Sequence, residues 1–183
     1  MSSSLIIKII TALIFAVVIG TPLFYQKTGV FPYTLGKALF FQAVVEIIFA
    51  LWLFLAISNR EYRPRLTPLM AALAAFLGAL VLTAFLGADL WRSFWSTYER
   101  AFGVFTILHL GALAIVLPSL GRKFPWRWLF YASLGTALAV SILALFQLGV
   151  PNLLLEEPTP DRPGATFGNP AFLAGYLLFH AFL

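Results

Sequence analysis

The sequence predicts an all-α fold, a polytopic transmembrane helical bundle with five full hydrophobic segments and a truncated sixth. The 183-residue chain is 61% hydrophobic and 10% charged, and its mean hydropathy is +0.94. One water-soluble core cannot bury so much apolar surface, so the lipid bilayer is the expected solvent. No internal repeat interrupts the pattern, and we interpret residues 1–183 as a single membrane-embedded domain.

The first hydrophobic segment runs from Leu5 to Leu23. Its length reaches the ~20 residues that a bilayer requires. No small-x-small cleavage site precedes Thr21 and Pro22, and the apolar run is longer than the core of a secretory signal. We therefore expect a retained membrane helix rather than a cleaved signal.

Five further hydrophobic segments follow. They are Gly36 to Ile57, Pro68 to Gly87, Ala101 to Leu120, Trp126 to Val150, and Pro170 to Leu183. At ~1.5 Å rise per residue, the last segment covers only about 21 Å of a ~30 Å hydrocarbon core. We therefore expect the chain to be the N-terminal part of a longer protein.

The positive charges predict the orientation in the membrane. Of the 12 lysines and arginines, seven lie at the N-terminal end and in the second and fourth loops, and five lie in the other three loops and their margins. The seven are Lys8, Arg60, Arg63, Arg65, Arg122, Lys123 and Arg127, and the five are Lys27, Lys37, Arg92, Arg100 and Arg162. Because cytoplasmic loops carry the excess of positive charge, we place the N-terminus in the cytoplasm and Arg162 outside.

The composition argues against several classes of function. The net charge of +5 comes from cations that lie mostly between apolar runs. Such cations orient helices, so nucleic-acid binding is not expected. The chain has no cysteine, which excludes disulfides and cysteine metal sites. Its two histidines, His109 and His180, are far apart in the sequence, and no Walker or dinucleotide motif is present. We therefore expect neither a metal site nor a nucleotide cofactor.

The stretch richest in functional signals begins at Arg162. Prolines and glycines punctuate residues 162–169, which predicts an irregular loop. Pro170 then begins a helix, with Asn169 as its N-cap. An arginine beside backbone donors at a helix start is a plausible receptor for phosphate, although loop punctuation alone would predict the same residues.

The third loop, Asp89 to Arg100, predicts a short helix on the membrane surface. Apolar and aromatic residues occur there at helical spacing, with charged and hydroxyl residues between them. They are Leu90, Trp91, Phe94, Trp95, Tyr98 and Phe102. The alternative is a platform for a sugar or lipid headgroup, on which the rings stack while Arg92 or Arg100 holds an anion.

Two polar positions stand out inside the hydrophobic segments. Glu46 is the only carboxylate well inside such a segment, and Gln42 lies one helical turn before it. An ionised carboxylate in lipid is costly unless it is paired, so we expect Glu46 to face the bundle or a wet cavity and hypothesise a hydrogen bond to His109. Gln147 is expected to make an interhelical hydrogen bond or to reach a polar ligand.

The third segment carries a stripe of small residues. Ala71, Ala75 and Ala79 share one face, and Ala74 and Gly78 lie beside it. Small side chains let helix backbones approach closely, so we expect this stripe to pack against another helix.

Four short blocks then occur in an order that spans nearly the whole chain. They are Thr21-Pro-Leu-Phe-Tyr25, Phe31-Pro-Tyr-Thr-Leu-Gly-Lys37, Ser93-Phe-Trp-Ser-Thr-Tyr-Glu-Arg-Ala-Phe-Gly103, and Arg162-Pro-Gly-Ala-Thr-Phe-Gly-Asn-Pro170. Together they resemble the N-terminal half of bacterial O-antigen ligase-like membrane proteins, a group to which O-antigen polymerases are related.

The resemblance implies a glycosyltransferase of the bacterial inner (cytoplasmic) membrane that works on its outer face without a nucleotide sugar, a cofactor or a required metal. Such enzymes transfer a glycan from an undecaprenyl-diphosphate carrier to a lipid A core, a polysaccharide or a protein hydroxyl. Arginines near the outer face hold the diphosphate. Arg162 fits this role best and Arg100 second, and Asn169 and Arg92 are further candidates for substrate binding.

Two departures from the family pattern bear on activity. The family's turn often reads Asn-Pro-Asn, whereas this chain has Asn169, Pro170 and Ala171, which removes one polar contact. The catalytic base is expected beyond Leu183, in the large outer loop that usually supplies a histidine. We therefore expect this fragment to be inactive alone.

Two rival functions come from other classes. A transporter or channel subunit would place Glu46 and His109 on an ion or proton path. A non-catalytic membrane assembly protein would fit a native chain that ends at Leu183.

The orientation can be tested directly because the chain lacks cysteine. Single cysteines introduced at Ser119 and Thr159 should react with a membrane-impermeant thiol reagent from opposite sides of the membrane. Intact spheroplasts and permeabilised cells provide the two labelling conditions. Labelling of both positions from one side would contradict the predicted topology.

Overall fold

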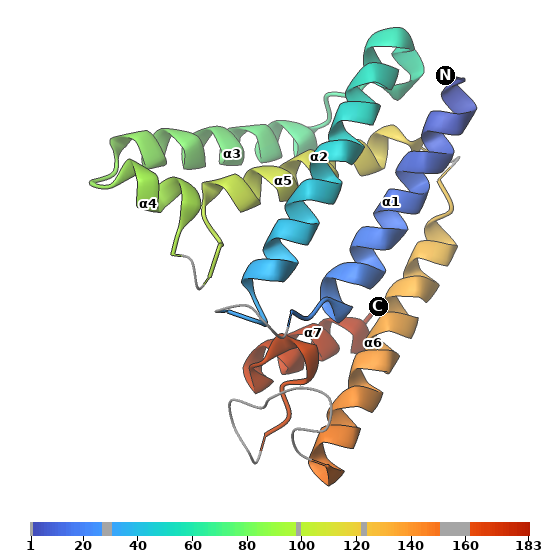
Figure 1. Ribbon diagram of the computed structural model, residues 1–183. Coiled ribbons are helices and arrows are strands. Elements are labelled where there is room, and N and C mark those ends of the chain that lie inside the picture. Colours follow the sequence, from blue (N-terminus) through green and yellow to red (C-terminus); the bar gives the residue numbers. More distant parts are fainter. Residues whose placement is uncertain (1, 27–30, 98–99, 122–123, 151–161) are drawn as a thin grey trace. The chain divides into compact units, whose positions relative to one another are not determined.

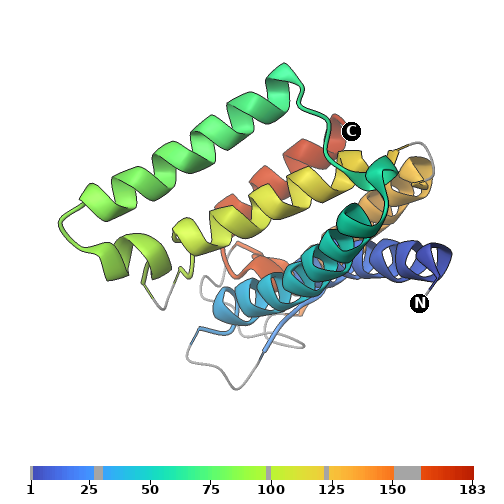
Figure 2. The same cartoon turned by 90° about the horizontal axis from the view of Figure 1, so that it is seen from above.

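The computed structural model describes residues 2–26, 31–97, 100–121, 124–150 and 162–183 (Figures 1 and 2). The described residues form helices and no strand, which confirms the all-α prediction. The helices are α1 Ser3–Leu23, α2 Leu35–Ser58, α3 Pro68–Leu86, α4 Leu90–Trp95, α5 Val104–Ser119, α6 Trp126–Gly149 and α7 Pro170–Ala181. Short 3-10 turns are η1 Arg60–Tyr62 and η3 Ala165–Phe167. Lys27, Tyr98, Arg122, Lys123 and Thr159 lie outside the described residues.

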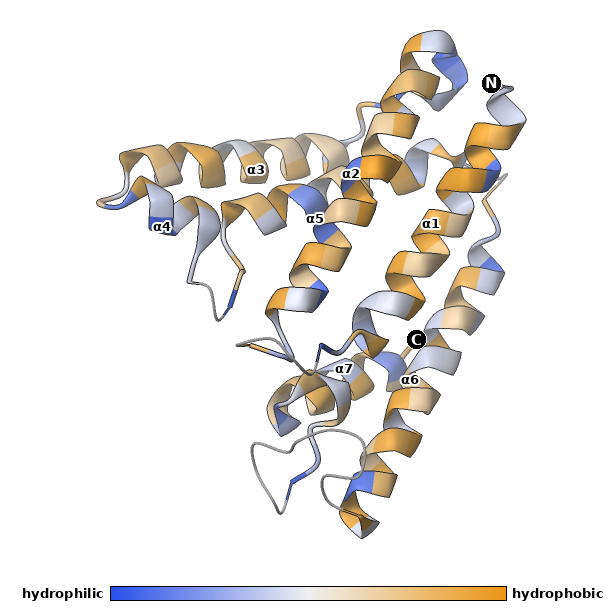
Figure 3. Cartoon of the chain, viewed as in Figure 1, coloured by the Kyte–Doolittle hydropathy of each residue, from blue (hydrophilic) through white to orange (hydrophobic). Residues whose placement is uncertain are grey.

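In the described part of the chain, four helices, α1, α2, α3 and α6, are long and apolar enough to cross a membrane. Hydrophobic residues predominate along these helices (Figure 3), and many of their large apolar side chains are exposed. Helix α5 has 16 residues and α7 has 12, so both are shorter apolar helices. The structure therefore supports a helical membrane protein with four candidate spans, and the count of five segments plus a sixth stays a prediction.

The chain divides into two compact units. Unit 1 comprises Met1–Ile14 and Ala38–Phe124, and unit 2 comprises Phe15–Lys37 and Pro125–Leu183. Helices α1 and α2 each contribute residues to both units. Each unit is described by itself below.

Unit 1 is built around α5, which runs beside α3 (Figures 1 and 2) and is hydrogen-bonded to α2. Thr67 caps the start of α3 by accepting a hydrogen bond from the Met70 amide, with Pro68 in the first turn. Asp89 caps α4 in the same way, accepting from the Arg92 amide at 2.9 Å. Local capping signals therefore fix where α3 and α4 begin.

The third loop and the start of the fourth hydrophobic segment contain less helix than the sequence predicts. Helix α4 has six residues, because Ser96 adopts a left-handed backbone with φ of 66° and ends it. The segment expected from Ala101 becomes helical only at Val104, since Ala101 also has a positive φ of 47°. Gly103 lies so close to α4 that an added Cβ would be 2.2 Å from the Phe94 carbonyl oxygen. This close approach requires glycine at the turn into α5.

The expectation for the small-residue stripe of α3 is wrong for the described residues. Ala71, Ala75 and Ala79 are exposed there. Helix α3 meets α5 through larger side chains, and an added Cβ on Gly111 would lie 2.5 Å from Leu77 Cδ1. The small residue that permits the close approach is therefore on α5, and leucine from α3 packs onto it.

Unit 2 contains α6, η3 and α7. Its buried cluster consists of Val140, Ala144, Ala165 and Leu173. The partly buried side chains packed against it are Leu143, Phe167, Tyr176 and Leu177. Helix α7 begins as predicted, because Pro170 is in its first turn and Asn169 Oδ1 accepts a hydrogen bond from the Ala171 amide at 2.8 Å. The described part of the segment before α7, residues 162–169, is thus part of the packed structure of unit 2.

Candidate functional site

The first candidate site is the Arg162 loop, residues 162–169, in unit 2. Its central turn is held by α6, because the buried Ala165 amide donates a hydrogen bond to Gln147 Oε1 at 2.8 Å. Ala165 has a φ of 44° and Gly168 a φ of 64°, so the backbone turns sharply at both ends of η3. Gln147 therefore makes a hydrogen bond within the protein rather than reaching for a ligand, and this bond positions the loop.

The same loop is tied to the end of α1. The carbonyl oxygen of Pro22 accepts hydrogen bonds from Thr166 Oγ1 and from Lys37 Nζ, the latter at 2.9 Å. The Lys37 ammonium also lies 4.3 Å from the centre of the Phe167 ring. A cation over an aromatic face is attracted by the ring quadrupole, so Lys37 joins two segments that are distant in sequence.

Tyr33 completes this packing. An added Cβ at Gly168 would lie 2.2 Å from the Tyr33 ring, so the ring rests on the backbone of the loop. The rings of Tyr25 and Tyr33 are 5.3 Å apart. Three of the four sequence blocks, those around Pro22, Tyr33 and Gly168, therefore meet in one cluster, which we call the loop cluster.

The predicted ligands of this loop have different environments. Arg162 is exposed at the start of the loop and also interacts with other groups of the protein. Asn169 is exposed, and its side-chain oxygen is used as the helix cap. Arg162 is therefore the more available of the two for an anion, while Asn169 fixes the start of α7.

In unit 2, the hydroxyl groups of Thr21 and Tyr176 are buried without a hydrogen-bond partner among the described residues. The Tyr176 ring packs between Phe167 and His180, at centroid distances of 4.9 Å and 4.2 Å. Buried hydroxyl groups usually find a partner, so these two positions are suited to a water molecule or a polar ligand.

Arg92 and Arg100, the other predicted ligands, lie in unit 1 and are exposed. The rings beside them are largely engaged with one another, since Trp95 contacts Phe105 with centroids 4.6 Å apart and also packs on Trp91. Trp91 remains 74% exposed. The structure thus shows α4 packed on α5 and leaves the Trp91 ring open for other contacts.

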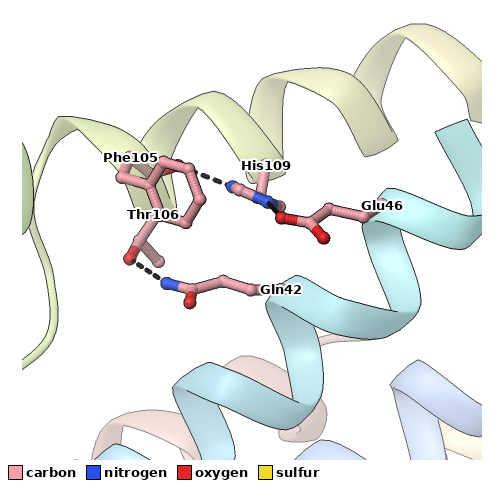
Figure 4. A network of polar contacts seen from close by, with 5 residues as sticks. All are labelled: Gln42, Glu46, Phe105, Thr106 and His109. Carbon is pink, nitrogen blue, oxygen red and sulfur yellow. Dashed lines mark hydrogen bonds and ion pairs between the residues drawn. The ribbon is translucent and has the colours of Figure 1, made fainter.

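The second candidate site is the Glu46 cluster of Gln42, Glu46, Thr106 and His109 between α2 and α5 (Figure 4). His109 Nε2 lies 3.2 Å from Glu46 Oε1, which confirms the expected pairing. One turn away, Gln42 Nε2 donates to Thr106 Oγ1 at 2.9 Å. The two pairs form a polar seam between apolar helices.

The backbone contact of His109 places a hydrogen on one of its two ring nitrogens. Its Nδ1 lies 2.7 Å from the Phe105 carbonyl oxygen, which can only accept, so Nδ1 carries a hydrogen. The contact between Nε2 and Glu46 then contains one proton, either on the carboxyl group or on the imidazole. The Glu46 side chain is 61% exposed and that of His109 is 10% exposed. The pair can therefore hold a proton with one end accessible.

His180 has a similar local arrangement in unit 2. Its Nδ1 lies 2.8 Å from the Tyr176 carbonyl oxygen, and its Nε2 lies 2.8 Å from Ser133 Oγ. The contact with Ser133 links α7 to α6. Within the described ranges, no three histidine or acidic side chains are grouped as a metal site would require.

Comparison of the chain with protein-family models, curated proteins and solved structures gives no match.

The contacts of Lys37 with Pro22 and Phe167 are not predicted from the sequence, which indicates only an orienting charge at this position. The position of Lys37 at the end of the Phe31–Lys37 block, at the start of a hydrophobic segment, was the available signal.

The loop cluster predicts a specific sensitivity at Gly168. Gly168→Ala places a methyl group against the Tyr33 ring and strains the positive φ, so it should destabilise the protein by about 1–3 kcal/mol. Gly175→Ala is the matched control, because nothing lies within 4 Å of its added Cβ on α7. Thermal unfolding of the purified protein in detergent measures both. Equal midpoints would contradict the close packing at Gly168.

A double-mutant cycle tests the Glu46 cluster. Glu46→Gln and His109→Ala should couple by about 0.5–2 kcal/mol in unfolding free energy, because both changes alter the same side-chain contact. Pairing Glu46→Gln with Ser133→Ala, which lies in the other unit, is the control and should be additive. Additive effects of the Glu46 and His109 changes would show that the two side chains contribute no interaction energy to stability.

Proposed function

We propose that this chain is the N-terminal part of an O-antigen ligase-like or polymerase-like glycosyltransferase. The supporting observation is the loop cluster, because three of the four blocks that carry the resemblance pack together there. Blocks separated by more than a hundred residues, Thr21–Tyr25 and Arg162–Pro170, are joined by a direct hydrogen bond. The blocks are thus parts of one built structure rather than unrelated loop punctuation.

The proposed substrate is a glycan on an undecaprenyl-diphosphate carrier. An acceptor hydroxyl, on a lipid A core, a polysaccharide or a protein, attacks the anomeric carbon. The bond from that carbon to the diphosphate oxygen breaks, the hydroxyl proton passes to a general base, and the diphosphate leaves with the bonding electrons. In this proposal the base belongs to a segment beyond Leu183.

Arg162 is the residue proposed to bind the leaving diphosphate. A guanidinium offers two parallel donors to phosphate oxygens, and charge develops on those oxygens as the glycosidic bond breaks. Arg162 is exposed, while the backbone that follows it is fixed by Gln147 and Thr166. A charged group on a fixed turn loses little reorganisation energy at the moment of reaction. Arg100 is the second candidate, and Arg92 and Asn169 are further ones.

The proposal includes a topology. Five membrane segments and a partial sixth, with the N-terminus in the cytoplasm of a bacterial cell, would put the Arg162 loop on the outer side of the inner membrane. The lipid-linked glycan would meet the loop there. Transfer would then need no nucleotide sugar, in agreement with the absence of a nucleotide-binding motif from the sequence.

Substitution of Arg162 tests the proposal. In a chain that contains the catalytic base, Arg162→Ala should abolish glycan transfer at unchanged protein level, with a loss of about 100-fold or more. Arg162→Lys should retain part of the activity, because an ammonium keeps the charge without the two-pronged geometry. Arg127→Ala, an exposed arginine in the fourth predicted loop, is the control and should leave transfer unchanged. Full transfer by Arg162→Ala would remove this residue from the mechanism.

A transport function is the second candidate, and the observed pair of Glu46 and His109 favours it. A pair that holds one proton within apolar helices is a feature of proton paths. Proteoliposomes with a pH gradient distinguish the two functions. Proton flux that depends on Glu46 and persists in Arg162→Ala would favour the transporter.

A further inference from the structure

The second loop of unit 1, between α2 and α3, is a fixed structure. Asn59 caps η1, Tyr62 is buried, and the Tyr62 carbonyl accepts a hydrogen bond from Trp52 Nε1 at 3.1 Å. Arg63 folds back on α2, where its Nε donates to the Ala56 carbonyl at 2.9 Å. This contact satisfies a carbonyl at the end of α2 that lacks an intrahelical partner. The loop therefore holds its side chains in defined places.

A cavity of about 600 Å³ opens between this loop, the start of α3 and the end of α5. Its charged side contains Glu61, Arg63 and Arg65, and its apolar side contains Met70 and Ile115. The volume is that of a site for a small organic molecule or a lipid headgroup. Because Glu61 already interacts with other groups of the protein, the arginines dominate the charge offered to a ligand.

Arg65 is the cation in this cavity that is open to a ligand. It is exposed and makes no hydrogen bond or ion pair with the residues that the structure describes. Arg63, by contrast, is used on the end of α2. The start of the 19-residue helix α3 lies at the same cavity, through Thr67, and its dipole adds positive potential there.

An apolar groove continues from the cavity between α3 and α5. It has a volume of about 190 Å³ and shares Pro64, Arg65, Met70 and Ile115 with the cavity. Beyond them, it is lined by Leu73, Ala74 and Leu77. The combined site thus has Arg65 at one end and an apolar groove along α3, a candidate membrane span.

This combination selects one class of ligand. A free anion would use Arg65 and leave the groove empty, whereas a phospholipid would fill both. Beside the site, Leu66 in the loop before α3 and Leu69 in the first turn of α3 are 89% and 78% exposed, as expected of side chains that face lipid. Clusters of basic residues between helices at the membrane surface bind anionic headgroups. We propose that the cavity and groove bind an anionic glycerophospholipid, with its phosphate on Arg65 and one acyl chain in the groove.

Native mass spectrometry of the delipidated full chain in detergent tests the charged end of the site. Dioleoyl phosphatidylglycerol should bind more tightly than dioleoyl phosphatidylethanolamine. Arg65→Gln should weaken phosphatidylglycerol binding about fivefold, which is the effect of one cation at a membrane surface. Arg60→Gln is the matched control, because Arg60 lies in the same loop but does not line the cavity. It should change the affinity by less than about twofold.

The groove is tested separately on α3. Ala74→Trp fills the groove and should reduce binding of phosphatidylglycerol. Ala72→Trp, an exposed position on α3 outside the groove, should not. Helical content by circular dichroism confirms that each variant is folded, and Ala74→Met provides a milder change if the tryptophan variant unfolds.

Three results would overturn the proposal. Equal binding of the two lipids would remove the preference for an anionic headgroup. Equal losses of phosphatidylglycerol affinity in Arg60→Gln and Arg65→Gln would show that binding depends on general surface charge and not on the cavity. Full displacement of the lipid by inorganic phosphate would identify a simple anion site. None of these results bears on glycan transfer, since the site involves neither Arg162 nor the loop cluster.

Discussion

The carbonyl oxygen of Pro22 is the acceptor on which the arrangement of unit 2 depends. It lies at the end of α1, where the last carbonyls of a helix have no intrahelical partner. Water can solvate such a group at the surface, but in an apolar environment a missing partner costs about 1–3 kcal/mol. Thr166 and Lys37 supply two donors to this one oxygen. The Arg162 loop is therefore held where the first helix ends.

The same constraint explains the polar side chains inside the apolar helices. Gln42, Glu46 and His109 would each be costly in lipid without partners, and each has one in unit 1. The Glu46 pair differs from the Gln42 pair in one respect, because its carboxyl group remains largely exposed. That exposure lowers the cost of a charged carboxyl group, while the partner ring of His109 is buried.

Local signals allowed much of the fold to be predicted from the sequence. Hydrophobic runs located the helices, and Asn169 and Pro170 located the start of α7, because capping depends on residues within one turn. The positive φ of Ala101 was not predictable, since no local rule favours it for alanine. The packing of the α3 stripe was predicted wrongly because small residues permit a close approach without choosing the partner. Gly111 met Leu77 instead.

In the site, sequence reasoning found the loop and the Glu46 pair but not the contacts that position the loop. The sequence predicts a hydrogen bond for Gln147 without its partner and gives no signal for Thr166, and the partners of the two lie 18 and 144 residues away. Such pairings depend on the packing of helices, which periodicity within one segment cannot specify. The prolines and glycines of residues 162–169 predict an irregular turn. The structure adds the hydrogen bonds of Gln147 and Thr166 that hold this turn in place.

Lys37 and Arg162, the two cations at the loop, differ in exposure, which bears on the proposed phosphate site. Lys37 is half-buried, donates to the Pro22 carbonyl and lies over the Phe167 ring, so much of its charge is already used within the protein. Arg162 is exposed, and its planar fork matches two phosphate oxygens. A ligand that recruited Lys37 would have to break the link between α1 and the loop. In the proposed mechanism, binding through Arg162 would leave that link intact, so the loop cluster would support the ligand site without being part of it.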